Sequence, residues 1–129
     1  MSGETQIEIL LENIQPLLSS EEYVFCSIES EDLKNLNLNP IGTFREKEGL
    51  TLILNKKEAD SHQLAYSAIF SMITLEVHSS LEAVGFIAAI ATKLAQHNIS
   101  VNPVSAYYHD HLFIPVTRSQ EAMNLLQGF

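Results

Sequence analysis

The sequence predicts an α+β fold in which a mainly antiparallel sheet carries helices packed on one face. Helix-like and strand-like segments alternate along the 129 residues, and both halves repeat a plan of paired strands with helices. The hydrophobic fraction of 46% is sufficient for a packed interior. We expect a first half with a leading helix in residues 1–68 and a second half in residues 69–129, which could also form one compact unit.

The chain begins with a predicted amphipathic helix. Pro16 would remove a hydrogen bond from the interior of this helix, so we expect the helix to end near Gln15. The apolar residues that recur at helical spacing are Ile7, Leu10, Leu11 and Ile14.

Strands dominate the remainder of the first half. The stretch YVFCSIE (residues 23–29) is rich in strand-forming residues, whereas residues 29–40 are expected to form a loop or a poor short helix. The runs IGTFRE and LTLILN are separated by KEG, which predicts a hairpin with Gly49 at its turn. Residues 56–64 predict a short helix.

The second half predicts the order strand, helix, strand, strand, helix. The apolar run IFSMITLEV suits a central strand buried on both faces. Ser79 and Glu82 have the spacing of a capping box for the helix that follows, and Asn98 tolerates a left-handed conformation at its end. ISVNPVSAYY and HLFIPV predict two strands joined by a turn at residues 109–110, and SQEAMNLLQGF predicts a last helix.

Composition excludes several classes of partner and location. Sixteen acidic and seven basic residues give a net charge of −9 without a basic cluster, so we expect neither nucleic acid nor an anionic membrane as a partner. No apolar run approaches the roughly 18 residues of a membrane span, and the N-terminus lacks the pattern of a secretory signal. Cys26 is the single cysteine, which we expect to be buried and inert in a cytoplasmic protein.

Four motifs carry a family resemblance: FREKEGLTL in the first half, and HSSLEAVG, LAQHNISV and YYHDH in the second. Together they resemble the ACT domain, most closely a group of uncharacterised bacterial proteins with two ACT domains. Gly85 occupies the position of the family's turn glycine, whereas Asn98 replaces a glycine and Glu82 an aspartate of the usual pattern. The helix end of the pattern is matched by Leu94, Ala95, Ile99 and Val101.

The resemblance implies tandem ferredoxin-like βαββαβ halves that form a regulatory module for a small-molecule ligand, usually an amino acid. The second half stops at Phe129 without an obvious final strand. Such a half would leave a sheet edge to be covered, and exposed edges favour pairing, so we expect a homodimer.

The turn HSSLEAVGF is the predicted ligand site. N–H groups at a helix N-terminus suit the carboxylate of a free amino acid, and a glycine lets the backbone approach the ligand closely. The competing interpretation of this turn is a capped helix start with a glycine needed for close packing. Arg45 could hold the ligand carboxylate with its guanidinium group, and the competing interpretation is that it forms cross-strand ion pairs. The predicted ligand-binding residues are His78, Ser79, Ser80, Glu82, Gly85, Ser100, Asn102 and Arg45.

YYHDH supports an enzymatic alternative. In a continuous strand His109 and His111 would share one face, and with His78 they would form a three-histidine metal site with an open position. The competing interpretation is a hairpin with a tight turn at Asp110. Because no nucleophile with a base and no glycine-rich phosphate loop is recognisable, we expect no catalytic residue, no metal and no cofactor.

We therefore expect a non-enzymatic module that binds or senses a small molecule. One alternative is a metal-dependent enzyme that uses the histidine pair. The other is a structural dimerisation module that regulates a partner protein by contact.

Overall fold

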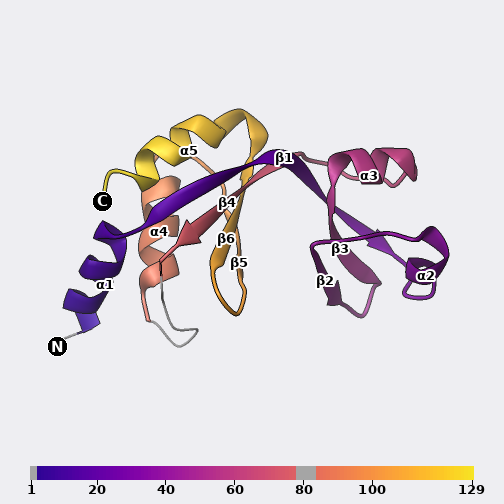
Figure 1. Ribbon diagram of the computed structural model, residues 1–129, viewed down its shortest axis with the longest axis horizontal. Coiled ribbons are helices and arrows are strands. Elements are labelled where there is room, and N and C mark those ends of the chain that lie inside the picture. The colour runs from indigo at the N-terminus through magenta and orange to yellow at the C-terminus, as the bar shows by residue number, and fades with distance from the viewer. Residues whose placement is uncertain (1–2, 78–83) are drawn as a thin grey trace. The chain divides into compact units, whose positions relative to one another are not determined.

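The computed structural model describes residues 3–77 and 84–129 and confirms the α+β class (Figure 1). Its sheet is formed by β1 (Gln15–Ile28), β2 (Gly42–Arg45), β3 (Leu50–Asn55), β4 (Phe70–Glu76), β5 (Asn102–Ser105) and β6 (Asp110–Pro115). The helices are α1 (Gly3–Glu12), α2 (Asp32–Leu36), α3 (Lys56–Ser61), α4 (Phe86–Ala95) and α5 (Ser119–Leu126), the last preceded by the short 3₁₀ helix η1 (Val116–Arg118).

The strand order is β2-β3-β1-β4-β6-β5. The chain divides into two compact units, of which unit 1 contains residues 1–20 and 71–129 and unit 2 contains residues 21–70. In unit 2, β1 pairs antiparallel with β3 from Tyr23 to Ile28. In unit 1, the first part of β1 lies beside β4 (Figure 1). A single strand therefore serves both units.

The length of β1 corrects two expectations. The predicted strand began at Tyr23, whereas β1 begins at Gln15, shortly after α1 ends at Glu12. Residues 15–20 occupy the sheet position next to β4, where the second half needs a final strand. The edge that was expected to be open is thus filled by the chain itself, and the sheet instead ends at β2 and β5.

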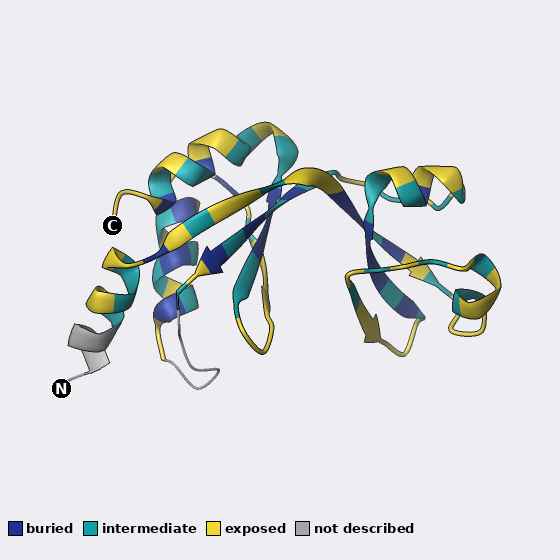
Figure 2. Cartoon of the chain, in the orientation of Figure 1, coloured by how far each residue is buried: buried dark blue, intermediate teal, exposed yellow. Residues whose placement is uncertain are grey.

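Each unit has its own apolar core under its helices (Figure 2). In unit 1 the core is formed by buried side chains of the sheet together with those of α4 and α5. The largest of these are Ile73, Leu75, Phe86, Ile90, Leu94, Leu112, Ile114 and Leu126. In unit 2 the core is Val24, Cys26, Leu50, Leu52, Leu54 and Ala59. Cys26 is buried as predicted, and burial raises the pKa of its thiol, which disfavours the reactive thiolate.

Burial alternates along β4 instead of covering both faces. Ser71, Ile73 and Leu75 are buried, while Met72 and Thr74 on the other face are only partly covered. The expectation of a strand buried on both faces was wrong. Side chains alternate across a strand, and the core cluster of unit 1 covers one face only.

The ends of α4 differ in how well the sequence predicted them. The helix begins at Phe86 with Gly85 as its N-cap, so the capping residue is not the predicted Ser79, which lies outside the described residues. At the other end Asn98 has φ 59°, the left-handed conformation that was expected there. Arg118 reinforces this end by donating to the backbone oxygens of His97 (2.9 Å) and Asn98 (3.2 Å).

The β5–β6 hairpin turns earlier than predicted. The amide of Ala106 donates to the oxygen of His109 at 3.0 Å, and β6 begins at Asp110. Asp110 therefore belongs to the strand, not to a tight turn. Within the described part of the chain, no helix is long and apolar enough to cross a membrane.

Candidate functional site

Only part of the predicted ligand site falls in the described structure. His78, Ser79, Ser80 and Glu82 lie outside the described residues. Gly85, Ser100, Asn102 and Arg45 can be placed.

Gly85 is exposed at the start of α4, where its backbone needs glycine. Its φ of 90° is in the left-handed region, which residues with a Cβ rarely adopt. A Cβ at this position would meet, among the described atoms, only Cγ1 of Ile7 at 3.9 Å. Among the described residues, the left-handed backbone conformation rather than close packing explains the glycine.

Ser100 and Asn102 lie at the opposite end of α4 from Gly85. Both follow the C-terminal end of the helix, and ten helical residues span about 15 Å. Asn102 pairs with Phe113 of β6, and its side-chain amide donates to the Phe113 oxygen at 3.4 Å. The structure separates these two residues from the turn at Gly85.

Arg45 ends β2 in unit 2, where it pairs in register with Leu50. It is exposed and forms no ion pair with any described residue, so the predicted cross-strand ion pairs were wrong. Within this hairpin Thr51 donates a hydrogen bond to the Glu46 carboxylate.

The two histidines of YYHDH lie close together, with ring centroids 6.4 Å apart. Nδ1 of His111 lies 2.9 Å from the Thr74 hydroxyl of β4, and Nδ1 of His109 is buried with no hydrogen-bond partner in the described structure. Burial lowers the pKa of His111 and His109 lowers it further, while Asp110 opposes them. The described residues contain no group of three His, Cys, Asp or Glu side chains that could hold a metal, and His78 lies outside them.

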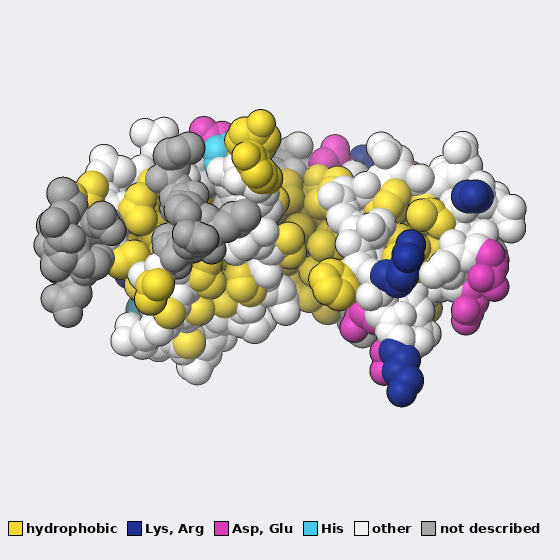
Figure 3. Space-filling model, turned by 90° about the horizontal axis from the view of Figure 1, so that it is seen from below, with side chains coloured by type: hydrophobic (Ala, Val, Ile, Leu, Met, Phe, Trp, Pro, Cys, Tyr) yellow, Lys and Arg dark blue, Asp and Glu magenta, His cyan; other side chains and the backbone are white. Residues whose placement is uncertain are grey.

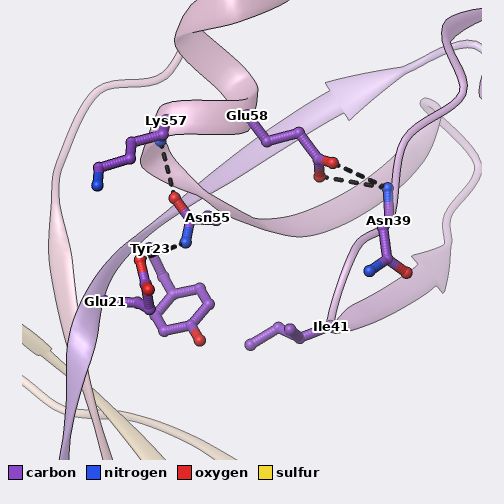
Figure 4. A pocket seen from close by; sticks show the side chains of 7 residues that line it. All are labelled: Glu21, Tyr23, Asn39, Ile41, Asn55, Lys57 and Glu58. Carbon is purple, nitrogen blue, oxygen red and sulfur yellow. Dashed lines mark hydrogen bonds between the residues drawn. The ribbon is translucent and has the colours of Figure 1, made fainter.

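Unit 2 contains a pocket that sequence analysis did not predict (Figure 4). Its volume of about 430 Å³ lies within the range of roughly 300–1,000 Å³ that is typical of small-molecule sites. Its walls come from β1, the segment before β2, the end of β3 and the start of α3. The lining residues are Glu21, Tyr23, Asn39, Ile41, Asn55, Lys57 and Glu58.

Hydrogen bonds tie the walls of this pocket together (Figure 4). Nδ2 of Asn55 donates to the Glu21 carboxylate at 2.6 Å, and Oδ1 of Asn55 accepts from the amide of Lys57 at 2.9 Å and so caps α3. Both carboxylate oxygens of Glu58 lie 3.2 Å from the amide nitrogen of Asn39. Asn55 therefore connects β1, β3 and α3 at one point.

Two models of the ACT domain match the chain, one over residues 2–71 and the other over residues 68–128. The protein belongs to the ACT domain family. The tandem ACT arrangement that the sequence motifs implied is thereby confirmed. ACT domains are typically regulatory modules for small molecules such as amino acids, rather than catalytic domains.

Solved structures show the same tandem fold. A protein of unknown function from Vibrio cholerae, described as a possible transport protein, is 47% identical with a TM-score of 0.86, and 98% of each chain is covered. The ligand-free regulatory subunit of aspartate kinase from Thermus thermophilus is 7% identical with a TM-score of 0.68, covering 92% of this ACT protein and 97% of that chain.

Aspartokinase III from E. coli, in complex with aspartate and ADP, is 12% identical with a TM-score of 0.60. This match covers 91% of the ACT protein and 34% of the kinase chain. At these low identities, the regulatory subunit and aspartokinase III share only the fold with this ACT protein. No protein of curated function matches the chain in sequence.

His111 predicts a pH dependence of stability. Its ordinary pKa of 6.5 is lowered in the folded chain, so the unfolded chain binds a proton first as the pH falls. The contribution of His111 to the free energy of unfolding is therefore complete above pH 6.5 and decreases as the pH falls below that value. Urea titrations between pH 7.5 and 5 should show a smaller loss of stability in His111→Gln than in the natural protein. Parallel losses in both proteins would contradict the prediction.

Proposed function

We propose that the protein is a non-enzymatic regulatory module whose ligand is a free amino acid. The observation that carries this proposal is that ACT domain models match both halves, together covering residues 2–128. The likeness to the regulatory subunit of aspartate kinase is consistent with it at the level of the fold.

We place the amino acid at the turn before α4. Gly85 is exposed, adopts φ 90° and has no side chain, so a small ligand can approach its backbone closely. The positive end of a ten-residue helix favours a carboxylate at this point. Ser100 and Asn102 are left out of the proposed site because they follow the other end of α4.

The enzymatic alternative has weaker support than ligand binding. His111 is hydrogen-bonded to Thr74, and the described residues contain no group of three His, Cys, Asp or Glu side chains that could hold a metal. The structural alternative, in which the protein regulates a partner by dimerisation, is compatible with the exposed edges of the sheet.

We further propose a homodimer that forms through the edge strand β2. Pro103 in β5 has no N–H to donate to a new strand, whereas β2 contains no proline and its Phe44 is 70% exposed. Hydrophobic side chains reach the surface on the face seen in Figure 3. The exposed apolar side chains at or near the two edges are Ile41, Phe44, Val104, Tyr107 and Tyr108.

A thermal-shift screen of the twenty proteinogenic amino acids tests the proposed ligand class. Ligand at 100 times its Kd adds about 2.7 kcal/mol to the free energy of unfolding, which corresponds to a rise in Tm of roughly 5–10 °C. We expect one amino acid, or a few chemically similar ones, to produce such a rise. A screen in which none does so would contradict the proposed ligand class.

The variant Gly85→Ala tests the position of the site. An alanine at φ 90° should cost about 1 kcal/mol of stability, and its methyl group would enter the space assigned to the ligand. Asn98→Ala is the matched control, because it places alanine at φ 59° at the other end of the same helix. Both variants should be similarly destabilised, but only Gly85→Ala should lose the ligand-induced shift. An unchanged shift in folded Gly85→Ala would place the site elsewhere.

Light scattering tests the dimer. We expect the mass of a dimer at tens of micromolar protein, and a monomer for Phe44→Lys, because the added charge would repel its symmetry mate at the β2 edge. A monomeric natural protein, or a Phe44→Lys variant that remains dimeric, would refute this interface.

A further inference from the structure

The pocket of unit 2 is acidic, and it is separate from the proposed amino-acid site at Gly85. Two of its charged lining side chains are acidic, Glu21 and Glu58, and one is basic, Lys57. Figure 4 shows Lys57 and Glu58 extending from α3 in opposite directions, with Glu58 directed toward the segment that holds Asn39. The net charge of the chain is −9. Both the pocket and the whole molecule therefore favour a cation.

Each of the two carboxylates accepts a hydrogen bond from a group on another wall of the pocket. The Glu21 carboxylate is oriented by the Asn55 amide at 2.6 Å, and Asn55 is itself fixed because it caps α3. The Glu58 carboxylate accepts the backbone N–H of Asn39. A carboxylate has about four acceptor positions, so Glu58 can also accept an ammonium group. Such prior orientation reduces the entropy that a ligand must lose on binding.

The chemistry of the lining indicates an organic cation rather than a metal ion. Metal ions need several donors that converge on one point, and the residues described here contain no group of three carboxylate, histidine or cysteine side chains that could supply them. In Figure 4 the side chains of Glu21 and Glu58 lie on different sides of the pocket, and those of Tyr23 and Ile41 lie along its lower part. Tyr23 is 7% exposed, so only a small part of its side chain reaches the pocket, whereas Ile41 is 52% exposed. A hydrocarbon chain would contact these two side chains.

We propose that this pocket binds a short aliphatic diamine. One ammonium group pairs with the Glu21 carboxylate and the other with the Glu58 carboxylate, and the hydrocarbon chain lies against Tyr23 and Ile41. This site is in unit 2, whereas the proposed amino-acid site at Gly85 is in unit 1. The two sites therefore take different ligands and are tested separately.

Isothermal titration of the full chain with 1,4-diaminobutane at low ionic strength and pH 7 tests the proposal. We expect saturable binding of one diamine per chain, about tenfold tighter than butylamine because each ammonium–carboxylate pair adds affinity. Glu21→Gln and Glu58→Gln should each weaken binding about tenfold, while keeping an oxygen that accepts the hydrogen bond from Asn55 or Asn39. Far-UV circular dichroism verifies that both variants are folded.

Glu48→Gln is the matched control, since it removes the same charge from an exposed residue of the β2–β3 turn outside the pocket. It should bind the diamine like the natural protein, as should Gly85→Ala. Lys57→Met should bind the diamine more tightly, because it removes a positive charge from the pocket. Its control is Lys47→Met, which removes a positive charge from the β2–β3 turn and should leave the affinity unchanged. Absent saturable binding, equal affinities for diamine and butylamine, or equal losses in Glu48→Gln and Glu58→Gln would each overturn the proposal.

Discussion

The structure depends on one strand that is shared by two compact units. β1 runs from Gln15 to Ile28, and the division between the units falls within it, after Ser20. Its first part completes the sheet of unit 1 beside β4, and its second part pairs with β3 in unit 2. Backbone hydrogen bonds along β1 thus stabilise both units, and the two cores are joined by the same continuous strand.

This sharing has a consequence for how the chain folds. Unit 1 needs residues 15–20 to meet residues from Ser71 onward, and the whole of unit 2 lies between them in the sequence. Contacts of high sequence separation form only after a large loss of chain entropy. The hairpin of β2 and β3 and the hairpin of β5 and β6 are local by comparison, because short turns connect their strands.

The sequence correctly predicted the features of the backbone that depend only on neighbouring residues. The first helix ends before Pro16, Gly49 lies in the β2–β3 turn, and Asn98 is left-handed after α4. Each of these features depends on the backbone of a few neighbouring residues. The first part of β1 could not be predicted in this way. Leu17 and Leu18 are consecutive apolar residues, so the sequence here lacks the alternation of apolar and polar residues that identifies a strand. In the structure both side chains are exposed, by 52% and 38%.

The candidate sites were harder to predict than the fold because they combine distant segments. The family motifs directed attention to Gly85, and its special backbone conformation is found in the structure. The contact of His111 with Thr74 depends on how β6 lies beside β4, which no single segment specifies. The pocket of unit 2 joins Glu21 to Asn55 and Asn39 to Glu58 across 34 and 19 positions of sequence. These residue types are common on surfaces, so nothing in the sequence distinguishes them.

Each unit contains a candidate ligand position, and the shared strand β1 connects the two units. A ligand that binds only the folded state stabilises whatever unfolds together with its site. If β1 makes the two units one cooperative structure, binding in either unit stabilises both, which is the basic requirement for communication between sites.

Differential scanning calorimetry of the full chain tests this cooperativity most directly. A strand shared by both cores predicts one unfolding transition, with equal calorimetric and van't Hoff enthalpies. Two resolved transitions, or a calorimetric enthalpy well above the van't Hoff value, would show that the units unfold independently and would contradict the central role assigned to β1.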